Sequence, residues 1–325
     1  MSLAAIEATA WLEVVVRRVA SAGGGVLVID LAHPTGAPLP SFTPGAHVAL
    51  RCGPDIVRHY SLCGAPDAPA NYRLGIKVEP QSRGGSAWIR DNVAPGARVV
   101  ISLPRNNFPL VTGRADYLFV SGGIGITPIL PMLAALRASG QRARLVHLCR
   151  SPAEAAFEDV LRDFASFHDV HLHFDTVAGT LFDVEGELDR TRAETEVYCC
   201  GPTALMDLVH AYANRRGCVE RYHFEFFNAP LEPDAARSQF VVVLASTGRE
   251  ISVDAGESIL SALRDAGLSL ESECEEGVCG TCAVRVLAGR PDHRDHYLTD
   301  AERAANDVIL PCISRAQSAS LTLDL

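Results

Sequence analysis

Four of the ten cysteines lie within the last 52 residues of this 325-residue chain, at a spacing that suits metal chemistry. Cys274, Cys279 and Cys282 form a C-x4-C-x2-C loop, and Cys312 follows after 29 intervening residues. Four thiolates spaced in this way are the plant-type ligand set of a [2Fe–2S] cluster, in which two irons share the four sulfur ligands. The sequence therefore predicts an iron–sulfur site at these four positions.

Two glycines within the loop fit the same chemistry. Gly277 and Gly280 allow the loop to turn tightly and to direct backbone N–H groups at the cluster sulfurs. A zinc site or uncombined thiols are the other interpretations, but a structural zinc site more often pairs two C-x2-C units, and only one such unit is present. The first residues, MSLAAIEATAW, have no basic stretch before an apolar core. We therefore expect a cytoplasmic protein, in which metal ligation is favoured over disulfides.

Two further motifs carry residues that suit a flavin nucleotide. The first motif is an R-x-Y-S pattern formed by Arg58, His59, Tyr60 and Ser61. The second motif, further along the chain, consists of Gly84, Gly85 and Ser86. An arginine can pair with a phosphate through its planar fork, a tyrosine offers a flat face to the ring system, and a serine hydroxyl can reach the flavin N5 region. The second motif precedes an expected helix at 87–92, whose first N–H groups form an anion site for the phosphate.

A third set of residues suits a nicotinamide dinucleotide and lies in a turn that follows a strand-like run. The set comprises Gly122, Gly123, Gly125, Thr127 and Pro128. Glycines let the backbone approach a pyrophosphate, and the start of a helix favours its charge. Pro128 suits a first helical turn, where its missing N–H costs nothing.

The choice between NADH and NADPH depends on the residues near the ribose. Rossmann proteins place an acidic residue about 20 residues beyond the glycines. Here that stretch ends in Cys149, Arg150 and Ser151, and the last two could hold a 2′-phosphate. Both cofactors therefore stay open at this point.

The runs between these motifs predict the elements that position them. A small antiparallel barrel is expected from strand-like runs at 11–19, 26–31, 47–51, 72–78 and 98–103. Strands then alternate with helices, which predicts a doubly wound parallel sheet with strands at 116–121, 144–149, 170–176, 196–200 and 222–226, and helices at 127–139, 153–167 and 203–216. A hairpin at 239–253 and a helix at 258–266 precede the cysteine loop.

Charge and hydropathy exclude some functions. The formal net charge is −10, which argues against a general nucleic-acid binder, and no apolar run approaches the roughly 18 residues of a membrane span. Residues 239–325 carry 14 acidic and 7 basic side chains, a net charge of −7. Solubility alone explains such a module, but an acidic surface around an electron exit would also attract a basic partner.

The cysteine loop, the hairpin and helix before it, and the final SLTLDL resemble a plant-type ferredoxin domain, and the whole chain resembles the phthalate dioxygenase reductase family. The resemblance implies a multidomain α/β and β protein. Its expected parts are a flavin-binding antiparallel β-barrel at 1–112, a doubly wound parallel α/β nicotinamide domain at 113–228, a linker at 229–238 and a C-terminal plant-type [2Fe–2S] ferredoxin domain of the β-grasp type at 239–325.

The same resemblance implies roles for particular residues. Ser61, Cys200 and Glu225 are the expected catalytic residues, with Cys200 beside the nicotinamide ring and Glu225 near it. Cys200, Gly201, Pro202 and Met206 resemble the family's C-G-P-x-x-L-M stretch, which lines the nicotinamide pocket. Cys200 can also be read as a buried strand thiol. Phe227 would lie against the flavin, and the strand with Ile76 and Lys77 would run along it. The family uses FMN, and the residues alone do not exclude FAD. The segment PDHRDH at 291–296 is expected to be a structured loop on the partner side and not catalytic.

These expectations combine into one function. NADH, or NADPH, would reduce FMN, and the [2Fe–2S] cluster would pass electrons singly to a Rieske-type oxygenase or demethylase that acts on an aromatic or small organic substrate. One alternative is a reductase for another acceptor, such as a haem-thiolate monooxygenase. Another is a redox-sensing protein, which would show slow or absent turnover of NAD(P)H. No nucleic acid or membrane partner is expected.

Overall fold

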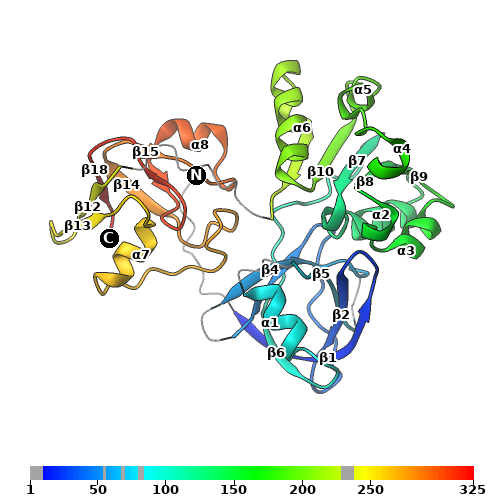
Figure 1. Cartoon of the computed structure of the whole chain (residues 1–325), viewed down its shortest axis with the longest axis horizontal. Coiled ribbons are helices and arrows are strands. Elements are labelled where there is room, and N and C mark those ends of the chain that lie inside the picture. The colour runs from blue at the N-terminus through cyan, green and yellow to red at the C-terminus, as the bar shows by residue number, and fades with distance from the viewer. Residues whose placement is uncertain (1–9, 54–55, 67–69, 80–83, 228–237) are drawn as a thin grey trace. The chain divides into compact units, whose positions relative to one another are not determined.

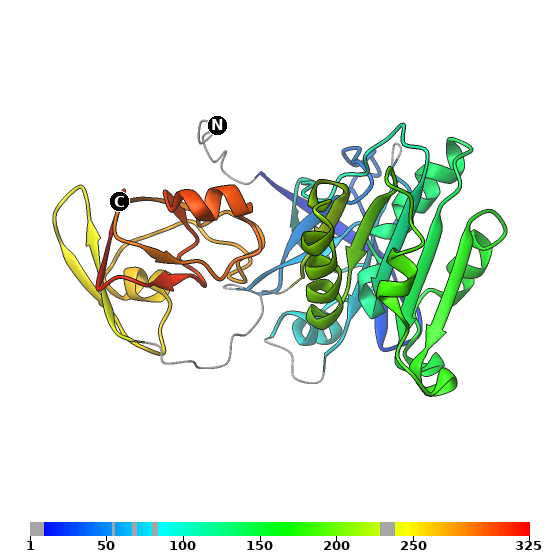
Figure 2. The same ribbon diagram turned by 90° about the horizontal axis from the view of Figure 1, so that it is seen from above.

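The structure, a computed structural model, describes residues 10–53, 56–66, 70–79, 84–227 and 238–325. Its contacts divide the chain into two compact units, the first ending at Glu225 and the second beginning at Phe226. The first unit contains two sheets, and the second unit contains one larger sheet and a two-stranded pair (Figures 1 and 2). The expected linker at 229–238 lies, except for Ser238, outside the described residues.

The first sheet of the first unit is the predicted antiparallel barrel. Its six strands run in the order β4-β3-β6-β1-β2-β5, and a bridge between Leu62 and Leu74 links its two edges. The strands are β1 (Trp11–Ser21), β2 (Val26–Ala32), β3 (His47–Arg51), β4 (Val57–Ser61), β5 (Tyr72–Lys77) and β6 (Arg98–Ser102). Alternate residues of five of these strands, together with Tyr60 of β4, fill a common apolar core, as expected for a closed sheet. The helix α1 (Gly85–Asn92) lies between β5 and β6 in the chain.

The second sheet is parallel, with the strand order β11-β10-β7-β8-β9. The strands are β7 (Tyr117–Gly122), β8 (Arg144–Cys149), β9 (Asp169–Phe174), β10 (Glu196–Cys200) and β11 (Tyr222–Glu225). The connecting helices are η1 (Gly123–Ile126), α2 (Ile129–Ala138), η2 (Pro152–Glu154), α3 (Glu158–Phe164), α4 (Asp175–Ala178), α5 (Val184–Leu188), α6 (Thr203–Arg216) and η3 (Val219–Arg221). The strands β8 and β9 follow β7 on one side of it, whereas β10 and β11 lie on its other side. The carboxyl ends of β7 and β10 therefore form the topological switch point, where such sheets bind ligands.

Glycines hold the barrel against the parallel sheet. A Cβ on Gly75 of β5 would lie 2.7 Å from Thr127 Cγ2 and 2.8 Å from Phe157 Cζ. The β1–β2 turn meets the same side, where the Phe157 N–H donates to the Ala22 carbonyl at 2.9 Å. The backbones therefore approach more closely than side chains would allow, which fixes the β7 turn next to the barrel.

The predicted helix at 153–167 is wrong. The structure breaks it into η2 and α3, because Phe157 between them adopts a left-handed conformation with φ 61°. A non-glycine residue in this region costs free energy, and it persists where surrounding contacts require it. Here the contacts of Phe157 with Gly75 and Ala22 provide that requirement.

The second unit is a mixed sheet of the β-grasp type, as the sequence predicted. Its strands are β12 (Phe240–Leu244), β13 (Glu250–Val253), β14 (Val284–Ala288), β16 (Val308–Ile309) and β18 (Ser320–Leu323), in the order β13-β12-β18-β14-β16, with a small β15 (Pro291–Asp292) and β17 (Arg315–Ala316) pair beside them. The helix α7 (Ile259–Asp265) packs its apolar side into the core of this sheet, and α8 (Asp300–Ala305) follows β15 (Figure 1). Within the described ranges, no helix is long and apolar enough to cross a membrane.

Candidate functional site

The R-x-Y-S residues occupy β4, and the structure brings its arginine to the start of α1. A Cβ on Gly85 would lie 2.5 Å from Arg58 Cγ, so the arginine side chain crosses directly over the glycine. Gly84 precedes α1 with φ 96°, a conformation that favours glycine. A guanidinium and the first N–H groups of an eight-residue helix therefore converge, which is the donor set that a phosphate requires.

The other predicted flavin residues lie on two strands of the barrel. His59 and Tyr60 are half-buried on β4, and Tyr60 packs against the barrel core. Ile76 of β5 is fully buried in that core, so only its main chain could face a cofactor. Lys77, the only lysine of the chain, lies 3.5 Å from Glu79 Oε1. Ser86 is in the first turn of α1.

Ser61 and Glu225, which are 164 residues apart in the sequence, meet at the end of β4. The Ser61 hydroxyl donates to Glu225 Oε2 at 3.0 Å. Removal from water raises the pKa of Glu225 to about 8, while the hydrogen bond from Ser61 opposes this shift. A carboxyl group with this pKa holds its proton at neutral pH, so the pair can carry a proton beside a flavin without placing a negative charge there.

The third predicted catalytic residue, Cys200, lies near this pair at the end of β10. Its side chain is fully buried, and burial, followed by the charges of Glu225 and Cys199, raises the pKa of its thiol. A protonated thiol is a poor nucleophile, so Cys200 is suited to packing against a ring and not to covalent catalysis.

Protonation of Glu225 gives a pH prediction. We expect the rate of flavin reduction by NADH to fall about tenfold as the pH rises through about 8, because an ionised carboxylate would oppose the negative charge gained by the flavin. Stopped-flow measurement of flavin bleaching from pH 6 to pH 10 tests this. In Glu225→Gln the step near pH 8 should disappear, and a step that survives in this variant would assign it to another group.

The two glycine-containing turns of the nicotinamide motif face each other. A Cβ on Gly125 would overlap the Cys200 carbonyl and lie 2.8 Å from the Gly201 nitrogen, and one on Gly122 would lie 2.5 Å from Pro202 Cδ. Gly123 has φ 53° with open space around it. The turn therefore leaves backbone at the switch point uncovered by side chains, as the approach of a pyrophosphate requires.

The remaining residues of this motif hold the turns in place. The Thr127 hydroxyl donates to the Ile124 carbonyl at 2.9 Å, and Pro128 is the residue immediately before α2. Met206 of α6 is buried. These side chains support the turns from inside, so their predicted contact with a dinucleotide stays a prediction.

A buried polar chain below the first turn was missed by the sequence analysis. His147 Nδ1 lies 2.8 Å from Ser121 Oγ, and His147 Nε2 lies 3.3 Å from Cys149 Sγ. Burial lowers the pKa of His147 to about 4 and raises that of Cys149 to about 11, so both are neutral at pH 7. Alternation of Ser, His and Cys at the ends of two apolar runs was the available signal, but it is equally typical of ordinary buried strands.

The residues at the end of β8 bear on the cofactor choice. Arg150 forms an ion pair with Glu154 at 2.9 Å, in which the arginine is exposed and the glutamate half-buried. An arginine already paired with a carboxylate is less available to a 2′-phosphate. This arrangement favours NADH over NADPH.

The four cysteines of the second unit lie close together. Contact with Cys279, and then burial, raises the pKa of the Cys274 thiol, and contact with Cys282, followed by burial, does the same for Cys312. Gly277 and Gly280 both have positive φ, 69° and 77°, as the tight loop requires. Three thiols on a loop of this shape, joined by the thiol of Cys312 from a separate segment, fit a [2Fe–2S] cluster, whose irons would replace the thiol protons.

Phe227 is half-buried two residues beyond Glu225, and its contacts group it with the second unit. The structure describes the two units individually, so its expected place against a flavin stays a prediction.

The chain is similar to known proteins over nearly its whole length. Residues 242–317 match the family of 2Fe-2S iron-sulfur cluster binding domains. The chain is 40% identical to vanillate O-demethylase oxidoreductase from Pseudomonas sp. strain HR199, with 97% of this chain and all of the relative covered.

Two solved structures are similar as well. Phthalate dioxygenase reductase, described as a modular structure for electron transfer from pyridine nucleotides to [2Fe–2S], is 37% identical with a TM-score of 0.75, and the match covers 97% of this chain and 98% of that one. An intact type IV self-sufficient cytochrome P450 monooxygenase is 36% identical with a TM-score of 0.81, and here 97% of this chain matches 41% of the larger one.

Proposed function

Because this chain belongs to the phthalate dioxygenase reductase family, we propose that it takes electrons from NADH and delivers them through FMN and a [2Fe–2S] cluster to a partner oxygenase or demethylase. The observation that carries this proposal is the full-length similarity to oxidoreductases of that kind, joined to the three sites described above. We place the domain boundaries at 1–112, 113–228 and 239–325, with the linker between the last two, and the protein in the cytoplasm.

Each site has its own task in this proposal. When bound, the flavin supplies the step from two-electron to one-electron transfer, which a [2Fe–2S] cluster requires. Arg58 and the start of α1 hold its phosphate, and the β4 strand with Tyr60 orients its ring. The glycine turn at Gly122–Gly125 holds the dinucleotide pyrophosphate against the carboxyl end of the parallel sheet.

The Ser61–Glu225 pair holds a proton at the place where the nicotinamide and the flavin would meet. The Ser61 hydroxyl donates to the carboxyl group, which is protonated at neutral pH and so adds no negative charge to the site. Cys200, buried and neutral, fills the space beside the nicotinamide ring. Its packing helps to keep water away from the hydride that is transferred.

The electron acceptor is expected to be a separate oxygenase protein. We propose a Rieske-type oxygenase acting on an aromatic or small organic substrate, because the relatives include a vanillate O-demethylase oxidoreductase and phthalate dioxygenase reductase. The similarity to a self-sufficient cytochrome P450 keeps a haem-thiolate acceptor as the second candidate.

The choice between these partners can be measured directly. The protein is reduced with NADH without oxygen and mixed with a purified Rieske oxygenase or a purified cytochrome P450, while the reoxidation of the cluster is followed. We expect the Rieske oxygenase to reoxidise the cluster at least about ten times faster. Faster reoxidation by the P450 would assign the haem-thiolate partner instead.

The acidic second unit predicts a dependence on salt. Residues 239–325 have a net charge of −7, so a basic one-electron acceptor such as cytochrome c should be attracted to them. Between about 0.01 M and about 0.15 M ionic strength the screening length falls from about 30 Å to about 8 Å, and we expect cytochrome c reduction to slow about tenfold. Flavin bleaching by NADH is the control. Equal slowing of both reactions would rule out attraction by the acidic unit.

A further inference from the structure

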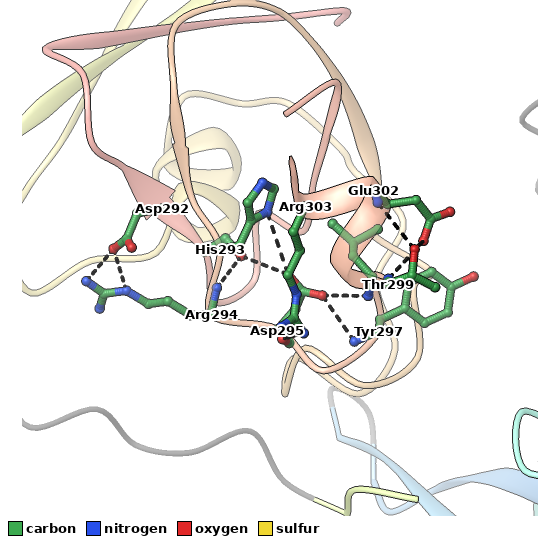
Figure 3. A network of polar contacts seen from close by, with 10 residues as sticks. Asp292, His293, Arg294, Asp295, Tyr297, Thr299, Glu302 and Arg303 are labelled. Carbon is green, nitrogen blue, oxygen red and sulfur yellow. Dashed lines mark hydrogen bonds and ion pairs between the residues drawn. The ribbon is translucent and has the colours of Figure 1, made fainter. Parts of the chain in front are cut away.

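A buried carboxylate lies at the centre of the segment that follows β15. The Asp295 side chain is fully enclosed, and its Oδ1 accepts the backbone N–H groups of Tyr297 at 3.0 Å and Leu298 at 2.8 Å. Figure 3 shows the contact with Tyr297, together with the approach of His293, whose Nδ1 lies 3.9 Å from Asp295 Oδ2. Arg303 of α8 donates to the main-chain carbonyl of Asp295. The carboxylate therefore fixes the turn from 295 to 298.

This turn contacts the loop that carries three of the four cysteines. A Cβ on Gly277 would lie 3.1 Å from the Asp295 Cα, and the His296 N–H donates to the Gly277 carbonyl at 2.9 Å. The ring of Tyr297 lies directly over Gly280, where no Cβ could fit. Gly277 lies between Cys274 and Cys279 in the sequence. The turn therefore covers the loop on both sides of Cys279.

The same carboxylate reaches the segment that carries the fourth cysteine. The Ser314 hydroxyl lies 3.5 Å from Asp295 Oδ2, at the limit of a hydrogen bond, and it accepts the Arg294 N–H at 3.2 Å. Ser314 is fully buried and lies two residues beyond Cys312. Asp295 thus contacts two segments that are separated in the sequence and that together supply all four sulfur ligands.

Burying a carboxylate in this way costs free energy unless hydrogen bonds replace the contacts with water that are lost. Its placement between the two segments indicates a task that an apolar residue would not perform. We propose that Asp295 is a positioning residue for the iron–sulfur cluster, which holds the 274–282 loop and the Cys312 segment at the separation that the cluster needs. The inference rests on the proposed function, since it requires that the four cysteines bind a cluster.

Asp295→Ala and Asp295→Asn test this proposal in the intact protein. The alanine removes both backbone contacts, so we expect the cluster to be lost about ten times faster, measured as the decay of its visible absorption with a chelator present. The asparagine keeps an oxygen for the two N–H groups, so its decay should stay within about twofold of the wild type. The visible circular dichroism of the cluster should change in Asp295→Ala and be restored in Asp295→Asn.

Asp292→Ala is the matched control, because Asp292 lies in the same segment but pairs with Arg294 at 2.7 Å instead of contacting the cysteine loop. It should lose its cluster at the wild-type rate. If Asp295→Ala does not fold, Ser314→Ala removes the contact with Asp295 Oδ2 together with the acceptor of the Arg294 N–H, and should still speed the loss about fivefold. The proposal is overturned if Asp295→Ala, or Ser314→Ala when it has to replace that variant, loses its cluster no faster than the wild type. It is also overturned if Asp292→Ala loses its cluster as fast as Asp295→Ala. A wild-type protein without any cluster would instead overturn the proposed function.

Discussion

Replacing Cys279 by alanine abolishes electron transfer to cytochrome c while leaving reduction of the flavin intact. We expect the NADH-dependent reduction of cytochrome c to fall on the order of 100-fold, because the three remaining thiolates leave one iron with only one of its two protein ligands and the cluster is not retained. NADH-dependent reduction of ferricyanide, a small acceptor that can take electrons from the flavin, should stay within about twofold of the wild type.

The control for this variant is Cys218→Ala. Cys218 is a half-buried thiol of the first unit, far from the cysteine loop in the sequence, and it makes a weak contact with the Ala213 carbonyl at 3.8 Å. It should keep both activities. If Cys279→Ala kept its iron–sulfur absorption and its cytochrome c activity, the assignment of the four cysteines as ligands would be wrong.

Gly125→Ala should abolish the use of NADH. The added methyl group would overlap the Cys200 carbonyl and approach the Gly201 nitrogen to 2.8 Å, which pushes the glycine turn away from the end of β10. Backbone atoms are displaced less easily than the ends of side chains, so the distance between the glycine turn and the end of β10 must increase. We expect kcat/KM for NADH to fall about 100-fold, and displacement of this kind is known to cost that much at other sites.

Gly140→Ala is the matched control for this prediction, because Gly140 also has a positive φ, 74°, and a Cβ there meets nothing within 4 Å, but it lies beyond the end of α2 and outside the glycine turn. We expect this variant to keep kcat/KM for NADH within about twofold of the wild type. The flavin spectrum should be unchanged in both variants. Equal kcat/KM values for the two would show that the contact between Gly125 and Cys200 does not shape the nicotinamide site.

The sequence predicts those parts of the protein that are encoded locally. The C-x4-C-x2-C loop, the R-x-Y-S pattern and the glycine turn are each contained within about ten residues. The closely spaced strand-like runs predict the barrel, and the alternation of strands with helices predicts the parallel sheet. Short strands such as β15 to β17 of the second unit were not predicted, because two-residue strands have no periodicity to detect.

Contacts between distant segments could not be predicted in this way. The left-handed Phe157 depends on Gly75 and Ala22, which lie more than 80 residues before it, and no local pattern indicates this break in a helix. Asp295 was placed in a loop on the partner side, yet its side chain is buried and joins two ligand segments. Its importance depends on the folded arrangement of Gly277 and Ser314 around it.

The most direct test of the whole account is the visible spectrum of the purified protein, recorded without oxygen before and after one equivalent of NADH. We predict flavin bands on a broad iron–sulfur shoulder, both of which bleach when NADH is added. A flavin spectrum without cluster absorption would contradict the ferredoxin assignment of Cys274 to Cys312. Both cofactors present but unchanged by NADH and by NADPH would contradict the proposed electron path itself.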